Sequence, residues 1–206
     1  MKSRRTFIVS AAAAVAVLAE LGAFPQPLRW TTDSAIGTIA SLQDGLIAAS
    51  RSASIDERFR TLEPLIAATH DLPYIAEFAL RRQWSSLAEA DRERFVAAFE
   101  RLSVMTYAAR FKAVGVGTFR PMKAEPADAS GRIQVKTAIA RADQPDVSLE
   151  YLLQRDGENW KIINVVADGV SDLALKRAEY QRVFATGGIE GLIAELEHQT
   201  DRLERG

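Results

Sequence analysis

The feature that most constrains the fold of this chain is a change in the period of its apolar residues after Gly115 and Gly117. Between residues 34 and 112, apolar residues recur at the spacing of amphipathic helices. Between residues 118 and 167 they alternate with polar residues, as they do along a half-buried strand. Helices followed by strands favour an α+β fold, in which helices cover an antiparallel sheet.

The helical pattern occurs on both sides of the predicted strands. Gly187 and Gly188 follow a helical segment, and glycine at that position is a common helix stop, so the last helical region is expected to divide there. Pro73 is placed to open a short helix. The approximate bounds that we expect for the helices are 34–50, 54–66, 73–80, 87–112, 172–185 and 189–203.

Two sequence signals predict where helices begin. Ser54 with Glu57, and Ser86 with Glu89, both have the spacing of a capping box. In that motif the serine oxygen accepts a hydrogen bond from the backbone N–H three residues later. We therefore expect a helix to start immediately after each serine.

The strands follow one another along the chain, which predicts an antiparallel meander. We expect strands at 132–140, 147–154 and 159–167, with Asp156-Gly157 as a hairpin turn and a further edge strand at 118–124. Pro121 argues for the edge position because it cannot donate to a ladder. Alternation places these residues on one face: Ile133, Val135, Thr137, Ile139, Val147, Leu149, Tyr151 and Leu153.

The strand 159–167 is unusual because it is apolar on both faces. Trp160, Ile162 and Val166 would lie on one side, and Ile163 and Val165 on the other. An antiparallel sheet normally keeps one face in water. Flanking helices or a partner chain would cover the second face, or an apolar ligand would lie between the sheet and the helices.

The N-terminus has the pattern of an export signal. Lys2, Arg4 and Arg5 precede the uncharged run 6–19, which is too short to span a bilayer, and small residues follow it. We expect residues 1–23 to be a signal peptide, 24–33 a flexible lead-in and 34–206 a single domain. The pair Arg4-Arg5 is similar to a twin-arginine signal, although an ordinary signal with two arginines explains it equally well.

Charge and cysteine content exclude several classes of function. Removal of residues 1–23 takes three basic groups and one acidic group from the 26 and 27 of the whole chain, which leaves a formal charge of −3. That balance gives no reason to expect a nucleic-acid partner. The chain has no cysteine, so disulfides, thiolate metal sites and cysteine nucleophiles are excluded.

Two places in the chain invite a catalytic interpretation. Asp168 at the end of an apolar strand, with Tyr151, would suit a small isomerase, and His70 precedes Asp71 as in a proton relay. A structural interpretation explains more residues: Asp168 begins a turn, Ser171 caps a helix, and Asp71 caps the helix that follows an exposed His70. We therefore predict no catalytic residue, no metal and no cofactor.

Several segments together are similar to a known family. "DLPYIAEFALRRQW", "LSVMTYAARF", "DGENWKIINVVADGVSDLAL" and "YQRVFATGGIEGLIAEL" resemble the MlaC/toluene-tolerance family of periplasmic lipid-binding proteins. "LSVMTYAARF" and "DGVSDLAL" look closest to its hopanoid-associated HpnM branch. The resemblance covers residues 38–198, with the motifs in the same order as in the family.

The resemblance implies a fold and a function. It implies a curved antiparallel sheet, similar to that of nuclear transport factor two, packed on several helices around an apolar cavity. Members are not enzymes: they carry lipids between membrane-bound transport complexes of the two Gram-negative envelope membranes. The resemblance therefore implies a periplasmic lipid carrier, whose partners are a lipid and a membrane-bound lipid transport complex.

The apolar residues of the sheet and of the longest helix are the candidates for the wall of such a cavity. Ordinary core packing is the alternative for each of them. Arg177 is the candidate contact for a polar head group, a solvated helix face being its alternative. We prefer a hopanoid ligand, with a phospholipid as the first alternative and a small isomerase or dehydratase on the same sheet as the second. The candidate wall residues are Tyr74, Phe78, Phe95, Phe99, Met105, Ile133, Val135, Leu149, Tyr151, Trp160 and Ile162.

Overall fold

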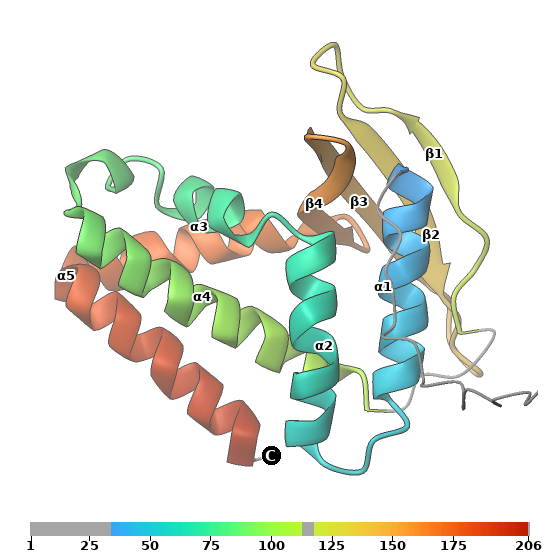
Figure 1. The fold of residues 1–206 in the computed structure, drawn as a ribbon, viewed down its shortest axis with the longest axis horizontal. Helices are drawn as coiled ribbons and strands as arrows, with labels where there is room; N and C mark the ends of the chain where they lie inside the picture. Colours follow the sequence, from blue (N-terminus) through green and yellow to red (C-terminus); the bar gives the residue numbers. More distant parts are fainter. Residues whose placement is uncertain (1–33, 113–117, 206) are drawn as a thin grey trace, which may run out of the picture.

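The computed structural model describes residues 34–112 and 118–205. The predicted signal peptide and lead-in, and the glycines at which the apolar period changes, lie outside the described residues. Within them the structure is an α+β fold, as predicted, with helices first, a sheet next and a helical region last (Figure 1).

The helices agree with the predicted bounds to within a few residues. Ser34 caps α1 through a 2.9 Å hydrogen bond from the N–H of Gly37. Pro73 lies in the first turn of α3, where its missing N–H leaves no intrahelical bond unmade. The helices are α1 (Ala35–Ala49), α2 (Ile55–Thr69), α3 (Leu72–Leu80), α4 (Glu89–Arg110) and α5 (Asp172–Arg205), with a short 3₁₀ helix, η1, at Trp84–Ser86.

One of the two predicted capping boxes is wrong. Ser54 accepts a 3.2 Å hydrogen bond from the N–H of Glu57, as its box predicts. Ser86 instead belongs to η1 and donates to the carbonyl of Gln83, and α4 begins only after Ala88. Arg92 explains the difference, because its guanidinium donates to carbonyls of the η1 turn and holds that turn apart from the helix.

The strands form a single antiparallel sheet in chain order, β1-β2-β3-β4-β5, so the predicted meander is confirmed. The edge strand differs from the prediction: residues 118–120 make only brief contacts with the end of β2, and regular pairing starts after Pro121. Proline lacks the N–H that a continuous ladder requires. The strands are β1 (Lys123–Pro126), β2 (Ile133–Ile139), β3 (Val147–Asp156), β4 (Asn159–Ala167) and β5 (Val170–Ser171).

A β-bulge in β4 corrects the predicted sides of that strand. Leu152 pairs with Asn164 but Leu153 pairs with Ile162, so Ile163 is an extra residue without a partner. After the bulge, Val165 pairs with Tyr151 and therefore lies on the same side of the sheet as Ile162. A simple alternation rule had placed those two residues on opposite sides.

The apolar side of the sheet faces the helices. α1 lies against β1, β2 and β4 and crosses in front of the sheet in Figure 1. Thr38 of α1 donates a 3.0 Å hydrogen bond to the carbonyl of Trp160 in β4. α2 packs closely on α1, because a Cβ atom at Gly45 would lie only 2.2 Å from Leu65. α3 and α5 also contact β4, so helices from both ends of the chain pack on that strand.

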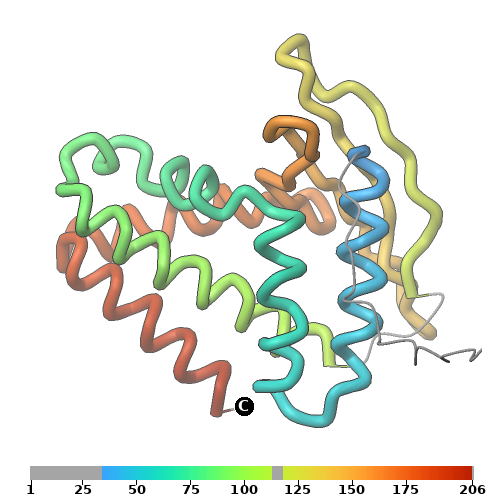
Figure 2. The backbone as a smooth tube through the Cα atoms, viewed as in Figure 1, coloured from blue at the N-terminus to red at the C-terminus, as the bar shows by residue number. Residues whose placement is uncertain are grey.

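The helix α5 consists of two helical halves that meet at Gly188, whose φ of 60° is outside the helical region. The predicted division of the last helical region is therefore observed. Figure 2 shows the second half turning back and running beside α4 towards the lower end of α2. Arg94 of α4 and Glu190 of α5 form a two-pronged ion pair of 2.5 and 2.7 Å across this contact.

Aromatic side chains fill the space between α4 and α5. The Phe95 ring lies 6.0 Å from that of Tyr180 and 6.3 Å from that of Phe99, between ring centroids. Tyr180 meets both phenylalanines edge to face, a favoured geometry for aromatic pairs. These residues are almost completely buried and form a close-packed core, which we call the aromatic core (Phe95, Phe99 and Tyr180).

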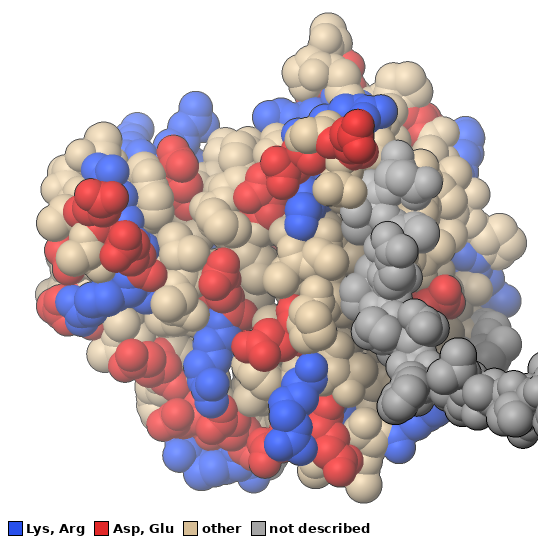
Figure 3. All heavy atoms as spheres, viewed as in Figure 1, with Lys and Arg blue, Asp and Glu red and all other residues tan. Residues whose placement is uncertain are grey.

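The outer surface carries both signs of charge. On the face shown in Figure 3, basic and acidic side chains are interspersed over α4 and α5. No helix in the described part of the chain is long and apolar enough to cross a membrane.

Candidate functional site

A cavity of about 370 Å³ lies between the apolar side of the sheet and the helices. We call it the sheet–helix cavity. Leu149 and Tyr151 of β3 and Val165 of β4 form the sheet wall, whereas Ile75 of α3 and Phe99 of α4 belong to the helix wall. Most of its lining is apolar, which is the usual character of a small-molecule site.

A short chain of hydrogen bonds crosses the helix wall. The Thr69 hydroxyl donates to the Leu65 carbonyl at 2.8 Å and lies 3.0 Å from Nδ1 of His70. Because the hydroxyl proton is directed to that carbonyl, Thr69 accepts from Nδ1–H, and Nε2 is left as an acceptor. The Tyr107 hydroxyl, 3.0 Å from Nε2, then donates to it. Every member of this chain has a partner.

The histidine in this chain is neutral. His70 is buried, and burial lowers its pKa from an ordinary value of 6.5 to about 3. Burial likewise raises the pKa of Tyr107 well above its usual range. The imidazole and the phenol therefore act as neutral dipoles inside the cavity, and neither is poised for proton transfer near pH 7.

The cavity opens beside β5 and the first turn of α5. Val170 and Leu175 line it and are exposed by 51% and 58%, which is unusual for large apolar side chains. Lys176 forms a 2.6 Å ion pair with Asp172 at the same place. The mouth thus combines apolar residues with a neutralised pair of charges.

A smaller cavity of about 260 Å³ adjoins the first. It lies where α3 and the start of α5 meet β4, and it shares Ile163, Asn164 and Leu173 with the sheet–helix cavity. Arg132 and Arg177 line it, and we therefore call it the arginine pocket. The two cavities share part of a wall and are both lined mainly by apolar groups, but the smaller one has two arginines and no acidic residue among its described lining residues.

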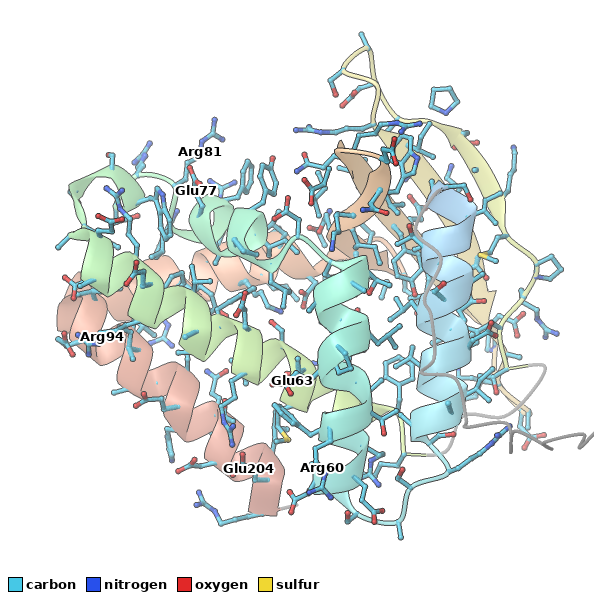
Figure 4. All side chains as sticks on the ribbon, viewed as in Figure 1. Arg60, Glu63, Glu77, Arg81, Arg94 and Glu204 are labelled. Carbon is cyan, nitrogen blue, oxygen red and sulfur yellow. The ribbon has the colours of Figure 1, made fainter. Side chains whose placement is uncertain are left out.

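A third hollow, of about 450 Å³, lies between α2 and α4. Its lining includes Glu63, Glu100, Arg101 and Lys161, and Figure 4 shows Glu63 between the two helices. Burial raises the pKa of Glu100. This groove is larger than the sheet–helix cavity but far more polar. No group of three or more metal-binding side chains occurs in the described ranges, 34–112 and 118–205.

A family model described as "MlaC protein" matches residues 38–198, which is most of the chain. The chain belongs to the MlaC family. The match covers the walls of the sheet–helix cavity, from α1 to the second half of α5.

A solved structure of similar fold supports this assignment. It is the phospholipid-binding protein from Ralstonia solanacearum in complex with a phospholipid. The two structures superpose with a TM-score of 0.67 at 19% sequence identity, over 81% of this chain and 96% of the other. At that identity the likeness concerns the fold, which is therefore the same α+β arrangement in both proteins.

The candidate wall residues of this MlaC-family chain lie in three different parts of the structure. Four of them line the sheet–helix cavity: Phe99, Leu149, Tyr151 and Ile162. Tyr74, Phe78 and the head-group candidate Arg177 line the arginine pocket. The remaining five line neither cavity: Phe95, Met105, Ile133, Val135 and Trp160.

The five residues outside both cavities have identifiable surroundings. Phe95 belongs to the aromatic core, and Met105 lies in the buried core at the same helix. Val135 is fully buried, opposite Tyr151 and between β1 and β3. Ile133 packs against the core, and Trp160 lies under the Arg155 guanidinium at the α1 end of the sheet. Ordinary packing therefore accounts for all five.

The residues considered for catalysis have structural roles. The Asp168 carboxylate is exposed and accepts a 2.8 Å hydrogen bond from the N–H of Ser148. Ser171 caps the start of α5 by accepting from the N–H of Ala174. Asp71 caps α3 through the N–H of Tyr74, as predicted. The prediction of an exposed His70 is wrong, because the imidazole turns inward to Tyr107.

Sequence reasoning missed several contributors to the cavity, of which Tyr107 and Val165 are instructive examples. Tyr107 lies two helical turns beyond Phe99 on the apolar stripe of α4, so its spacing could have indicated it. Val165 was assigned to the wrong side because a bulge leaves no distinct sequence signal in a wholly apolar strand.

Proposed function

We propose that this protein is a lipid carrier that holds hydrocarbon in the sheet–helix cavity. The observation that carries the proposal is an apolar cavity, bounded by a sheet and three helices, that opens at exposed apolar residues. Membership of the MlaC family and the fold shared with a phospholipid-binding protein support it. Both point to binding rather than to catalysis.

A carrier is needed because hydrocarbon is costly to expose to water. The cost is about 0.8 kcal/mol per CH₂ group, so a lipid with about 30 such groups would face roughly 25 kcal/mol. A protein that buries the tails removes most of this barrier. No fuel and no catalytic base are needed in the carrier itself.

The ligand that we propose first is a phospholipid. Sequence resemblance alone favoured a hopanoid and the HpnM branch, with a phospholipid as the alternative. The order is now reversed by two observations: the similar fold binds a phospholipid, and a cationic pocket adjoins the apolar cavity. A hopanoid would use the apolar wall but would give the arginines no anionic partner.

The size of the cavity adds one requirement. Its volume of about 370 Å³ is near the lower end of the range of about 300–1,000 Å³ for ligand sites, well below the size a whole membrane lipid requires. We therefore propose that the helix wall moves away from the sheet when the tails enter. Hydrogen exchange of the backbone amides, measured with and without bound lipid, tests this movement. On lipid binding we expect the amides of the sheet to exchange more slowly and the exchange rates in α3 to change.

We further propose that the carrier works in the periplasm, after export and removal of residues 1–23, with a membrane-bound transport complex as its partner. The basic and apolar pattern of the N-terminus supports export. N-terminal sequencing of the periplasmic form tests the cleavage, and an intact Met1 there would contradict it.

Mass spectrometry under native conditions tests the carrier function. The full chain is expressed with its own N-terminus, the exported protein is purified without detergent, and its mass is compared before and after denaturation. We expect an additional mass that extraction identifies as a phospholipid. Protein that purifies free of lipid and takes up none from vesicles would contradict the proposal.

The alternative of a small isomerase or dehydratase receives no support from the geometry. Asp168, its general-base candidate, is an exposed turn residue and does not line the sheet–helix cavity. We expect Asp168→Asn to leave lipid content unchanged.

A further inference from the structure

The arginine pocket has an unusual polar lining. Its polar side chains include two guanidinium groups, Arg132 and Arg177, a phenol, an amide and a hydroxyl. Among its described lining residues none is acidic. The remaining wall is apolar, formed by side chains such as Leu152 and Ile163. Such a pocket attracts a ligand that brings its own negative charge and acceptor atoms.

The buried Nε–H of Arg177 has no hydrogen-bond acceptor in the described part of the chain. Its Nε is completely buried and has no hydrogen-bond partner, and the side chain forms no ion pair with any described residue. The guanidinium instead lies 5.2 Å from the Phe78 ring centroid, while Arg81 lies 5.3 Å from the same ring. A buried N–H without an acceptor is destabilising, and nearly all such groups in proteins are paired. The unpaired Nε–H of Arg177 therefore points to an acceptor from outside the chain.

Two other side chains that line the arginine pocket, Asn164 and Arg132, also carry hydrogen-bond donors. The Asn164 Oδ1 accepts from the Ser171 hydroxyl at 3.0 Å and from the N–H of Leu173, so the amide NH₂ group remains as a donor. Arg132 donates to the Tyr74 hydroxyl at 3.3 Å, and among the described residues it forms an ion pair only with Asp128, at 3.8 Å. Both arginines line the pocket and have N–H groups without an acceptor among the described residues.

We propose that the arginine pocket binds a phosphate group, with Arg177 as its central contact. The planar guanidinium suits two oxygens of one phosphate, and Arg132 and Asn164 would bind the remaining oxygens. The wall shared through Ile163, Asn164 and Leu173 puts this group next to the apolar cavity. The phosphate is then that of a lipid whose tails occupy the sheet–helix cavity, an assignment that rests on the proposed function. Free phosphate is the other source of the same chemistry.

The test compares lipids that have the same acyl chains but differ in the head group, two of which contain a phosphate and one of which does not. Vesicles containing phosphatidylglycerol, phosphatidylcholine or diacylglycerol with identical chains are incubated with the exported protein, and bound lipid is counted by mass spectrometry. We expect the wild type to prefer both phosphate-bearing lipids to diacylglycerol. Arg177→Gln should lose that preference by about tenfold or more while still loading diacylglycerol, since hydrogen bonds to charged groups are the strong ones.

Matched variants separate the site from a general loss of charge. Arg182→Gln removes an exposed arginine from the same helix and should keep the preference. Arg177→Lys should retain part of it, because an ammonium keeps the charge without the two-pronged geometry. Thermal melts should show Arg177→Gln to be at least as stable as the wild type when empty, because the change removes an unpaired buried N–H.

Inorganic phosphate distinguishes the two sources and separates this proposal from the carrier function. Phosphate binding that disappears in Arg177→Gln, in a protein that takes up no lipid, would support the pocket as an anion site and contradict the carrier function. Equal preference for phosphate-bearing lipids in wild type and Arg177→Gln would overturn the proposal. The proposal would also be overturned if the wild type took up lipid without preferring phosphate-bearing lipids and did not bind inorganic phosphate.

Discussion

Val135 and Tyr151 lie directly opposite each other in the sheet, on the same apolar side, yet they face different surroundings. Both are buried, and both belong to strands with the same alternating pattern. Val135 is enclosed by protein, whereas Tyr151 lines the sheet–helix cavity and its hydroxyl has no hydrogen-bond partner among the described residues. α1 packs on part of this side of the sheet, whereas the sheet–helix cavity faces another part of it.

The comparison shows that burial alone does not identify a ligand wall. A residue that faces an enclosed cavity and one that packs in the core have similar exposed fractions. What differs is the material on the other side: side chains in one case, and in the other a space that water or lipid fills. Substitutions with a charged residue should separate the two cases.

The largest effect is expected for Val135→Glu. A carboxylate there would be buried without a partner, at a cost of about 5 kcal/mol or more, which is comparable to the whole stability of many domains. We expect the variant not to fold. Tyr151→Glu should fold, because water in the empty cavity hydrates the carboxylate, but it should purify without lipid. Circular dichroism melts and lipid content together make the comparison.

Tyr151→Phe is the control for that pair. It keeps the apolar surface and removes a hydroxyl that has no partner among the described residues, so folding and lipid content should both remain near wild type. A folded Val135→Glu that loses lipid would move Val135 into the cavity wall. An unfolded Tyr151→Glu would return Tyr151 to ordinary core.

The substitution Phe95→Ala tests whether a void in the core is sufficient to bind lipid. The Phe95 ring contacts Trp84, Phe99 and Tyr180, so its removal leaves a void in the aromatic core. We expect a loss of about 3–5 kcal/mol in the free energy of unfolding, measured by urea denaturation. Lipid content of the folded fraction should not change. A gain or loss of bound lipid would mean that the void left by Phe95 reaches the sheet–helix cavity through Phe99, which belongs to both the aromatic core and the cavity wall.

His70 should make stability depend on pH. Its pKa is about 3 in the folded protein and near 6.5 in the unfolded chain, so between these values the unfolded state binds more protons. The contribution of His70 to the free energy of unfolding is therefore fully present above pH 6.5 and is lost as the pH decreases towards 3. From pH 7 to pH 5 the expected loss is about 2 kcal/mol.

A variant without the titrating group isolates this effect. In His70→Gln the free energy of unfolding should change less between pH 7 and pH 5, by about 2 kcal/mol, than in the wild type. Denaturant titrations at both pH values measure the difference. An identical pH dependence in the two proteins would mean that His70 is accessible to protons in the folded state.

The smallest effect concerns helix starts. Ser54 caps α2, so Ser54→Ala should cost about 1 kcal/mol, whereas Ser86 caps no helix and Ser86→Ala should cost clearly less. Equal losses in urea denaturation would show that the second capping box contributes after all.

Local sequence signals predicted the α+β order, the meander and most helix bounds, because these follow from residue periods and from glycine and proline positions. These signals did not predict features that depend on contacts between residues far apart in the sequence. The bulge at Ile163 is an example, since the pairing of β3 with β4 decides it. The inward turn of His70 depends on Tyr107, which lies on another helix.

The candidate site was predictable only in part for the same reason. The period of β3 places Leu149, Tyr151 and Leu153 on one side, but which of them packs on a helix and which faces the cavity depends on how the helices cross the sheet. Arg177 was a candidate from its sequence context, whereas its buried, unpaired Nε is visible only in three dimensions.

The most direct test of the central claim is to map where a lipid tail lies. The exported protein is loaded with a phosphatidylcholine that carries a photoreactive diazirine at the end of one acyl chain, then irradiated, digested and sequenced by mass spectrometry. The account predicts adducts on residues that line the sheet–helix cavity, such as Leu149, Tyr151 and Ile75, and none on Tyr180 or Val135. Adducts confined to the groove between α2 and α4, or spread over the outer surface, would contradict it.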